Sequence, residues 1–393
     1  MLSSLAFIFL LGLLLGYLSL KIKLPALIGM ILTGVILGPY MLDLLAPNLL
    51  DISADLRKLA LVIILTRAGL ALNLKDLKRV GRPAILMCFV PATFELIGIL
   101  VFAPLLFPIS LLDAAVMGTV IAAVSPAVIV PKMLYLLEHK YGTDKSIPQL
   151  IMAGGSVDDV FVIVLFTAFT ALAAGGEMNI GQFAQIPISI VMGVLLGVLL
   201  GALFVYYFKH YHMRDSVKVI LLLSISFLLI ALEEEMKGIV PLSGLLAIMA
   251  IGITILKKYD VLAMRLSFKF TKLWVAAEIL LFVLVGATVD LHYAVSAGLS
   301  AVLLILLALL FRMVGVYCSL LGTSLNTKER LFCMIAYTPK ATVQAAIGAI
   351  PLGMGLPHGE LILTVAVLSI LITAPLGALG IDMTYQKLLK WNE

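Results

Sequence analysis

Residues 148–174 read PQLIMAGGSVDDVFVIVLFTAFTALAA, an apolar run with two adjacent aspartates, Asp158 and Asp159, near its centre. A run of this length can cross a bilayer as a helix. A carboxylate at bilayer depth costs about 2.5–3.5 kcal/mol even on the translocon insertion scale, so two neighbouring carboxylates need a reason. A salt-bridged structural pair is one interpretation. Two consecutive aspartates after a Gly-Gly-Ser step favour a functional one, because a pair of carboxylates can exchange a proton for a hard cation.

The composition of the whole chain agrees with this membrane setting. Of its 393 residues, 63% are hydrophobic and 12% are charged, whereas about a quarter of a typical soluble domain is charged. We therefore exclude a soluble globular protein and predict an all-α polytopic membrane protein. The net charge of +5 does not indicate a nucleic-acid partner, because the basic residues are dispersed over short loops. Cys88, Cys318 and Cys333 lie in apolar runs and predict no disulfide framework.

Thirteen apolar runs of membrane-spanning length divide the chain. They lie near residues 2–20, 24–41, 58–74, 83–107, 111–136, 148–174, 183–208, 216–234, 238–256, 272–290, 295–322, 329–353 and 357–379. If the N-terminus is outside the cell, most of the 27 lysines and arginines fall in cytoplasmic loops. The positive-inside rule therefore predicts an N-out, C-in orientation. The first run has no basic n-region and no small-residue cleavage site, so we expect a retained helix rather than a cleaved signal peptide.

Two of these spans contain the same helix-breaking motif. The sequence is AVSP at residues 123–126 and AYTP at residues 336–339. Proline removes a backbone donor and clashes with the preceding turn, so Pro126 and Pro339 are expected to interrupt their helices. An isolated proline kink is the alternative interpretation for either one alone.

The positions of the two motifs predict an inverted repeat. They lie in the fifth and twelfth spans, which are seven apart and therefore run in opposite directions. With residues 1–174 as the first six-helix repeat, 183–208 as a connecting helix and 216–381 as the second repeat, each interruption falls in the fifth helix of its repeat. Secondary transporters build midplane ion sites from two crossing broken helices of this kind.

The expected ion site combines the aspartate pair with the interruptions. We expect Asp158 and Asp159 to bind a cation and protons, and Ser125 and Thr338, which directly precede the prolines, to add oxygens. The freed helix ends carry partial charges. Lys340 follows the second proline, and we expect it to neutralise the carbonyl ends of the half-helices rather than to snorkel.

An intramembrane arginine, Arg312, needs a partner because it cannot lose its proton in a protein. Adjacent helical positions differ by about 100° around the axis, so Asp158 and Asp159 cannot both face one cavity equally. One of them can face the ion path while the other pairs with Arg312. Glu95 is a competing partner, and the sequence leaves the choice open. Two further intramembrane charges, to which the sequence assigns no role, are Arg67 and Glu278.

With these residues in view, the chain resembles sodium/proton antiporters of the cation:proton antiporter superfamily. It is similar to the two-aspartate branch and most similar to NHA-type members. The two-aspartate and two broken-helix segments are together quite specific. The matching segments are GSVDDVFVIV (155–164), AAVSPAVIVPKML (122–134), LVIILTRAGLALNLKDLK (61–78), VPLSGLLAIMAIGI (240–253), LLFVLVGATVD (280–290) and PKATVQAAIG (339–348).

The resemblance implies a homodimer of 13-helix protomers in the inner cell membrane. Its core domain would comprise spans 83–174 and 295–379, and its dimer domain spans 2–74 and 216–290. In this family the core moves against the dimer domain like an elevator.

The resemblance also implies roles for the site residues. Asp159 would carry Na⁺ and the proton, and Asp158 would be its partner, associated with the basic residue of the eleventh span. That residue is lysine in well-known two-aspartate members and Arg312 here. A lysine could release a second proton, whereas an arginine cannot. We therefore expect one-for-one exchange if Arg312 occupies Asp158, and a two-proton exchange becomes possible if it occupies Glu95.

The functional hypothesis is a secondary antiporter that exchanges Na⁺ or Li⁺ for H⁺ without a cofactor, and not an enzyme. A K⁺/H⁺ antiporter or K⁺ efflux system of the same fold is the alternative. An intramembrane aspartyl protease would need two acids on separate helices and a GxGD segment, which the sequence lacks. A passive channel would favour rings of carbonyls or charges over one aspartate pair.

Overall fold

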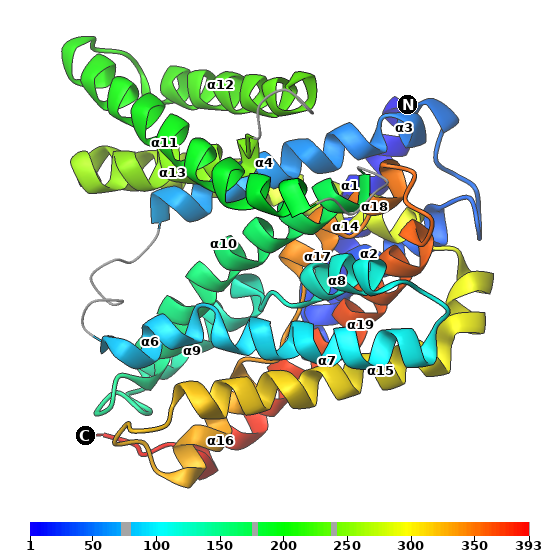
Figure 1. Ribbon diagram of the computed structural model, residues 1–393, viewed down its shortest axis with the longest axis vertical. Coiled ribbons are helices and arrows are strands. Elements are labelled where there is room, and N and C mark those ends of the chain that lie inside the picture. The colour runs from blue at the N-terminus through cyan, green and yellow to red at the C-terminus, as the bar shows by residue number, and fades with distance from the viewer. Residues whose placement is uncertain (72–79, 175–179, 237–241, 393) are drawn as a thin grey trace. The chain divides into compact units, whose positions relative to one another are not determined.

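The computed structural model describes residues 1–71, 80–174, 180–236 and 242–392, and every named element within these ranges is a helix (Figure 1). The first half contains α1 (Leu2–Lys21), α2 (Ala26–Leu37), α3 (Pro47–Asp51), α4 (Ser53–Ala71), α6 (Arg82–Met87), α7 (Val90–Leu106), α8 (Leu111–Ile121), α9 (Pro126–Glu138) and α10 (Ile147–Ala174). The second half contains α11 (Ile180–His210), α12 (Asp215–Glu235), α13 (Gly244–Lys258), α14 (Asp260–Ala287), α15 (Leu291–Ser319), α16 (Thr327–Ala336), α17 (Thr342–Ile347), α18 (Ile350–Gly353) and α19 (Gly359–Leu388). The predicted all-α class is confirmed.

The predicted membrane spans coincide with these helices. Within the described residues, nine helical segments are long and apolar enough to cross a bilayer. The other expected spans correspond to the short helix α2, to the interrupted helix α16–α18, to α13, and to α4, which carries several charges. The count of thirteen crossings and the N-out orientation remain predictions.

The start of α14 differs from the sequence prediction. The span predicted to begin near residue 272 begins at Asp260, so Arg265 and Lys269 lie on α14 rather than in a loop. The Asp260 side chain accepts a hydrogen bond from Val261 N at 2.8 Å. This first stretch contains several charged residues, so its apolar content did not predict that it belongs to the same helix.

The fourth span, predicted as one helix, is interrupted between α6 and α7. The interruption lies at Cys88 and Phe89, directly before α7, whose second residue is Pro91. Proline is well tolerated in the first turn of a helix but breaks a continuing one. The prediction missed it because this proline lacks the Ser/Thr-Pro context of the other two.

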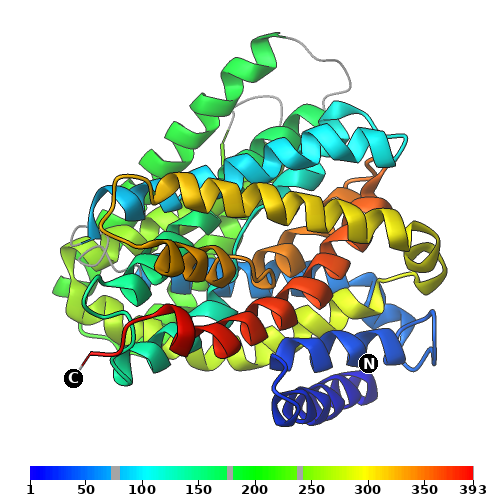
Figure 2. The ribbon, with the colours of Figure 1, turned by 90° about the horizontal axis from the view of Figure 1, so that it is seen from below.

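The chain forms two compact units. One comprises Met1–Ala54, Asn73–Phe169 and Leu281–Glu393, and the other comprises Asp55–Leu72 and Thr170–Leu280. In the first unit, α1 packs along α2 and α7 along α15, as Figure 2 also shows. In the second unit, α11 packs along α13. The predicted assignment of spans to a core and a dimer domain remains a prediction.

A close approach of two glycines joins α2 to the C-terminal end of α14. A Cβ at Gly34 would overlap the Val283 carbonyl, and one at Gly286 would overlap the Ile31 carbonyl. Small residues at such positions let helix backbones approach in a membrane, where lipid is as apolar as the helices and packing drives association. The glycines are therefore part of the interface that holds α2 in the first unit.

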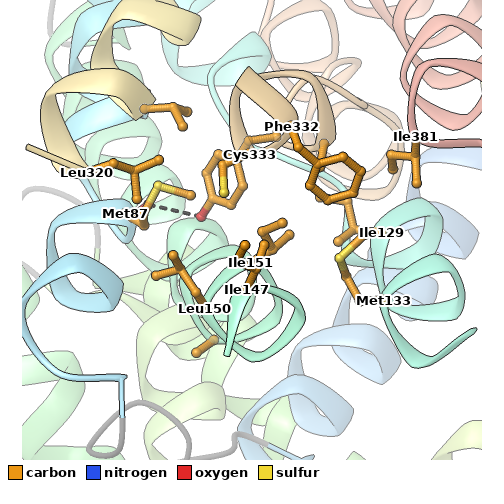
Figure 3. Packing of buried hydrophobic residues seen from close by; sticks show 14 of the residues in the cluster. Met87, Ile129, Met133, Ile147, Leu150, Ile151, Leu320, Phe332, Cys333 and Ile381 are labelled. Atoms are coloured by element: carbon orange, nitrogen blue, oxygen red, sulfur yellow. Dashed lines mark hydrogen bonds between the residues drawn. The ribbon is translucent and has the colours of Figure 1, made fainter. Parts of the chain in front are cut away.

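A buried hydrophobic cluster joins α6, α9, α10, α15, α16 and α19 in the first unit (Figure 3). Met87, Ile129, Ile151 and Phe332 are among its most buried members, each with an exposed fraction of 1% or less. Tyr337, at the end of α16, also belongs to the cluster and donates a hydrogen bond from Oη to the Met87 carbonyl at 2.9 Å. The cluster thus fixes α10, which carries the aspartate pair, to the helix that leads into the second interruption.

Candidate functional site

Two interrupted helices meet at the site. Residues 122–125 separate α8 from α9, and residues 337–341 separate α16 from α17, so both predicted interruptions are present in the structure. The two linkers contact each other directly, because Ser125 N donates a hydrogen bond to the Pro339 carbonyl at 2.8 Å. Unwound backbone of this kind is tolerated at membrane depth only where protein buries it or a cavity hydrates it.

Asp158 connects α10 to the first linker. Its side chain is fully buried, and its Oδ2 accepts hydrogen bonds from Val124 N at 2.7 Å and from Arg312 Nη2 at 3.1 Å. Buried carboxylate oxygens need hydrogen-bond donors, and here a backbone amide and a guanidinium supply them. Asp158 is therefore a structural anchor of the linker as well as an acid.

Arg312 contacts both acids between which the sequence could not choose. Its Nη1 lies 2.8 Å from Glu95 Oε2, and its Nη2 contacts Asp158. Nε donates to the Tyr337 carbonyl at 2.7 Å, and Nη1 also donates to the Ala122 carbonyl. The five donors of a guanidinium make this possible. One buried side chain thereby connects α7, α10 and both linkers.

Lys340 pairs with Glu95 rather than with the carbonyl ends of the half-helices. Its Nζ lies 2.5 Å from Glu95 Oε2, and both side chains are buried. Its backbone N donates to Thr373 Oγ1 of α19 at 2.9 Å. The end of α8 receives its donors from other residues, so Lys340 completes a network of two acids and two cations.

Gln344 is a site residue that the sequence analysis missed. The side chain is 1% exposed, and its Nε2 donates to the carbonyls of Ile121 at 3.0 Å and Ala123 at 2.8 Å. Its Oε1 accepts from Ala341 N at 2.9 Å. The available signal was a single amide in the otherwise apolar stretch that follows the second interruption, since a polar side chain at membrane depth needs partners.

Asp159 differs from its neighbour. It is 8% exposed, and no described basic side chain forms an ion pair with it. Its Oδ1, together with Asp158 Oδ1 and Ser125 Oγ, is buried and has no hydrogen-bond partner among the described residues. Thr338 is partly buried and donates its hydroxyl proton to the Ile335 carbonyl at 2.8 Å, which leaves the lone pairs of its oxygen. Carboxylate and hydroxyl oxygens without donors are suited to a hard cation or, on the carboxylates, a proton.

The remaining intramembrane charges, Arg67 and Glu278, belong to the second compact unit. They attract each other electrostatically there, on α4 and α14.

We predict that Arg312→Ala lowers the free energy of unfolding by about 3–5 kcal/mol, because it leaves buried carboxylates without a guanidinium. Thermal melting of the purified protein in detergent measures this. The matched control is Arg265→Ala, which removes an arginine that is 51% exposed from a pair with Asp215. Exposed pairs contribute about 1 kcal/mol or less. Equal melting of Arg312→Ala and the parent would contradict the buried network.

Comparison with known proteins identifies the family. Residues 6–387 match the family model described as sodium/hydrogen exchanger, transmembrane. Sodium/hydrogen exchanger 9B2 of Mus musculus is 32% identical over 385 residues, which cover 94% of this chain and 69% of that protein. Sodium/hydrogen exchanger 9B1 of Homo sapiens is 32% identical over 389 residues, covering 93% and 73%.

A solved structure supports the same fold. The sodium proton antiporter MjNhaP1 from Methanocaldococcus jannaschii at pH 8 superposes with a TM-score of 0.84, covering 98% of each chain at 20% sequence identity. The family match and the interrupted helices around a buried aspartate pair thus agree with each other. The chain belongs to the sodium/hydrogen exchanger family of membrane transporters.

Proposed function

We propose that this chain exchanges Na⁺ or Li⁺ for H⁺ by letting the cation and the proton compete for Asp159. The observation that carries the proposal is the position of Asp159 outside the ion-pair network. Glu95 and Asp158 each contact Arg312, and Glu95 also contacts Lys340. Two acids and two cations leave that network neutral.

The negative charge of Asp159 therefore has to be neutralised by an ion that binds and dissociates. An uncompensated carboxylate is strongly disfavoured in a medium of low dielectric constant. One proton or one monovalent cation neutralises it, and the two exclude each other on the same oxygens. Exchange then needs no separate coupling device, no cofactor and no nucleotide.

The oxygens without hydrogen-bond partners are those that we expect to coordinate the cation. Asp159 Oδ1, Asp158 Oδ1 and Ser125 Oγ have no donors, and Thr338 can add a hydroxyl oxygen from the second linker. A divalent ion would leave the site with a surplus positive charge, so the charge count favours a monovalent ion. Na⁺, Li⁺ and K⁺ can be distinguished by assay.

The network also bears on stoichiometry. Arg312 cannot lose its proton, and Lys340 lies against Glu95. Asp158 is occupied by Arg312 and Val124 N. Asp159 is then the exchanging group, which gives one proton for one monovalent cation and no net movement of charge.

The wider mechanism that we propose is alternating access of the elevator type in a homodimer. Spans 83–174 and 295–379 would form the moving core, and spans 2–74 and 216–290 the dimer domain, in the inner cell membrane. The hydrogen bonds that tie the linkers to each other, to Asp158 and to Arg312 support a core that carries its ion as one body. In a cell with an inward proton gradient, the exchanger would expel Na⁺.

We predict that Asp159→Asn abolishes cation-driven proton movement while the protein still folds and inserts, because the amide cannot exchange a proton for a cation. A pH-sensitive dye in proteoliposomes, with separate additions of Na⁺, Li⁺ and K⁺, measures it. Asp382→Asn is the matched control, since Asp382 is a 40% exposed acid paired with Lys132, and it should exchange like the parent. Near-normal exchange by folded Asp159→Asn would contradict the assignment of Asp159 as the exchanging group.

We also predict that the exchange rate does not respond to an imposed membrane potential, because one cation replaces one proton. The measurement uses proteoliposomes with valinomycin and K⁺ gradients that set the inside negative or positive. Strong acceleration by either potential would refute one-for-one exchange and indicate that Asp158 also titrates.

A further inference from the structure

We propose that Gln344 is a positioning residue of the exchanger, whose neutral amide holds the crossing linkers in the geometry that Asp158 and Arg312 require. The inference rests on the proposed exchange at Asp159. Gln344 is far from Asp158 in sequence and forms no bond with it. Its effect passes through the backbone of the first linker.

The polar groups of the first linker are shared among three side chains. Gln344 binds the Ile121 and Ala123 carbonyls, and Arg312 binds the Ala122 carbonyl between them. The next two residues contribute backbone donors instead. Val124 N donates to Asp158, and Ser125 N donates to the Pro339 carbonyl. The amide therefore fixes the carbonyls on either side of the one that Arg312 contacts.

The same side chain fixes the second linker. Gln344 Oε1 accepts from Ala341 N, next to Lys340. Ala341 has the backbone angles φ −166° and ψ −78°, so its N–H has no partner in a regular helix. One amide, with one acceptor and two donors, thus satisfies three buried backbone groups, one at the end of α8 and one on each linker. An unmade bond at any of them would cost free energy.

The neutrality of the amide matters as much as its hydrogen bonds. The charged groups around the linkers are Asp158 and Asp159 of α10, Glu95 of α7, Arg312 of α15 and Lys340. Of the helices packed against α17, α8 carries Asp113 about 12 Å of helix away from Ile121, and α19 carries Glu360 near its start and Asp382 and Lys387 near its end. A charge at residue 344 would therefore act directly on the balanced four-charge network.

Substituting glutamate at this position makes the hydrogen bonds and the charge of the side chain depend on pH. When protonated, its carbonyl oxygen can accept from Ala341 N and its hydroxyl can donate to one of the two linker carbonyls. When ionised, it is an acceptor only and faces the carbonyl oxygens of Ile121 and Ala123. Loss of the proton removes the donor and adds a third acid to the network.

The test compares Gln344→Glu with the parent in proteoliposomes across pH, as the ratio of their Na⁺-driven exchange rates. We expect a ratio within about threefold of unity at acidic pH, a fall of about tenfold or more as pH rises, and recovery on reacidification. The control is Gln386→Glu, an exposed glutamine of α19, whose ratio should stay constant. A pH-independent ratio for Gln344→Glu, whether high or low, would overturn the proposal.

A second variant and a second readout decide the case if Gln344→Glu does not fold. Gln344→Met is similar in size, buries no charge and lacks both donors and the acceptor. We expect exchange at least about tenfold slower at every pH, and faster hydrogen–deuterium exchange of the backbone amides in residues 122–125. Parent-like values of both for folded Gln344→Met would overturn the proposal. If the parent itself moves no Na⁺, the function assigned to Asp159 fails, while hydrogen exchange still decides whether Gln344 holds the linker.

Discussion

The structure depends on one constraint, which is that charges buried inside a membrane protein must be neutralised where they stand. Arg312 contacts both Asp158 and Glu95, and Lys340 contacts Glu95, so that two cations balance two acids. A complete network of this kind is tolerated, whereas removing one member leaves a costly unpaired charge. Asp159 is the acid that the network leaves over. A fixed counter-ion beside Asp159 would stabilise the protein but would also prevent exchange. Because no described basic side chain pairs with Asp159, its carboxylate is free to exchange a proton for a cation.

A second constraint concerns the backbone. Interrupting two helices exposes carbonyl and N–H groups that lipid cannot satisfy. Here buried side chains satisfy them, with Gln344 and Arg312 on the carbonyls of the first linker and Asp158 on the N–H of Val124. Two of these three are also members of the charge network. Charge balance and linker geometry are therefore coupled, and a change in the protonation of one acid is felt by the backbone that surrounds the ion.

The sequence was informative wherever a signal lies along the chain. Apolar length predicted the helices, and the Ser/Thr-Pro motifs predicted both interruptions beside the aspartate pair. The partners were not predictable, because Glu95 and Arg312 are 217 residues apart and Glu95 and Lys340 are 245 apart. Periodicity carries no information about contacts at such separations. The partner of Lys340 and the role of Gln344 follow only from how α7, α8, α15 and α17 assemble. The start of α14 was not predicted because it contains charged residues.

The central claim is that Asp159 alone trades one proton for one cation, while the other four intramembrane charges of the site keep their protonation. It is tested most directly without transport, by measuring the protons released when Na⁺ is added to the purified protein in weakly buffered detergent solution. The account predicts about one proton per bound Na⁺ for the parent and none for Asp159→Asn. Release of two protons by the parent, or undiminished release by the variant, would contradict it.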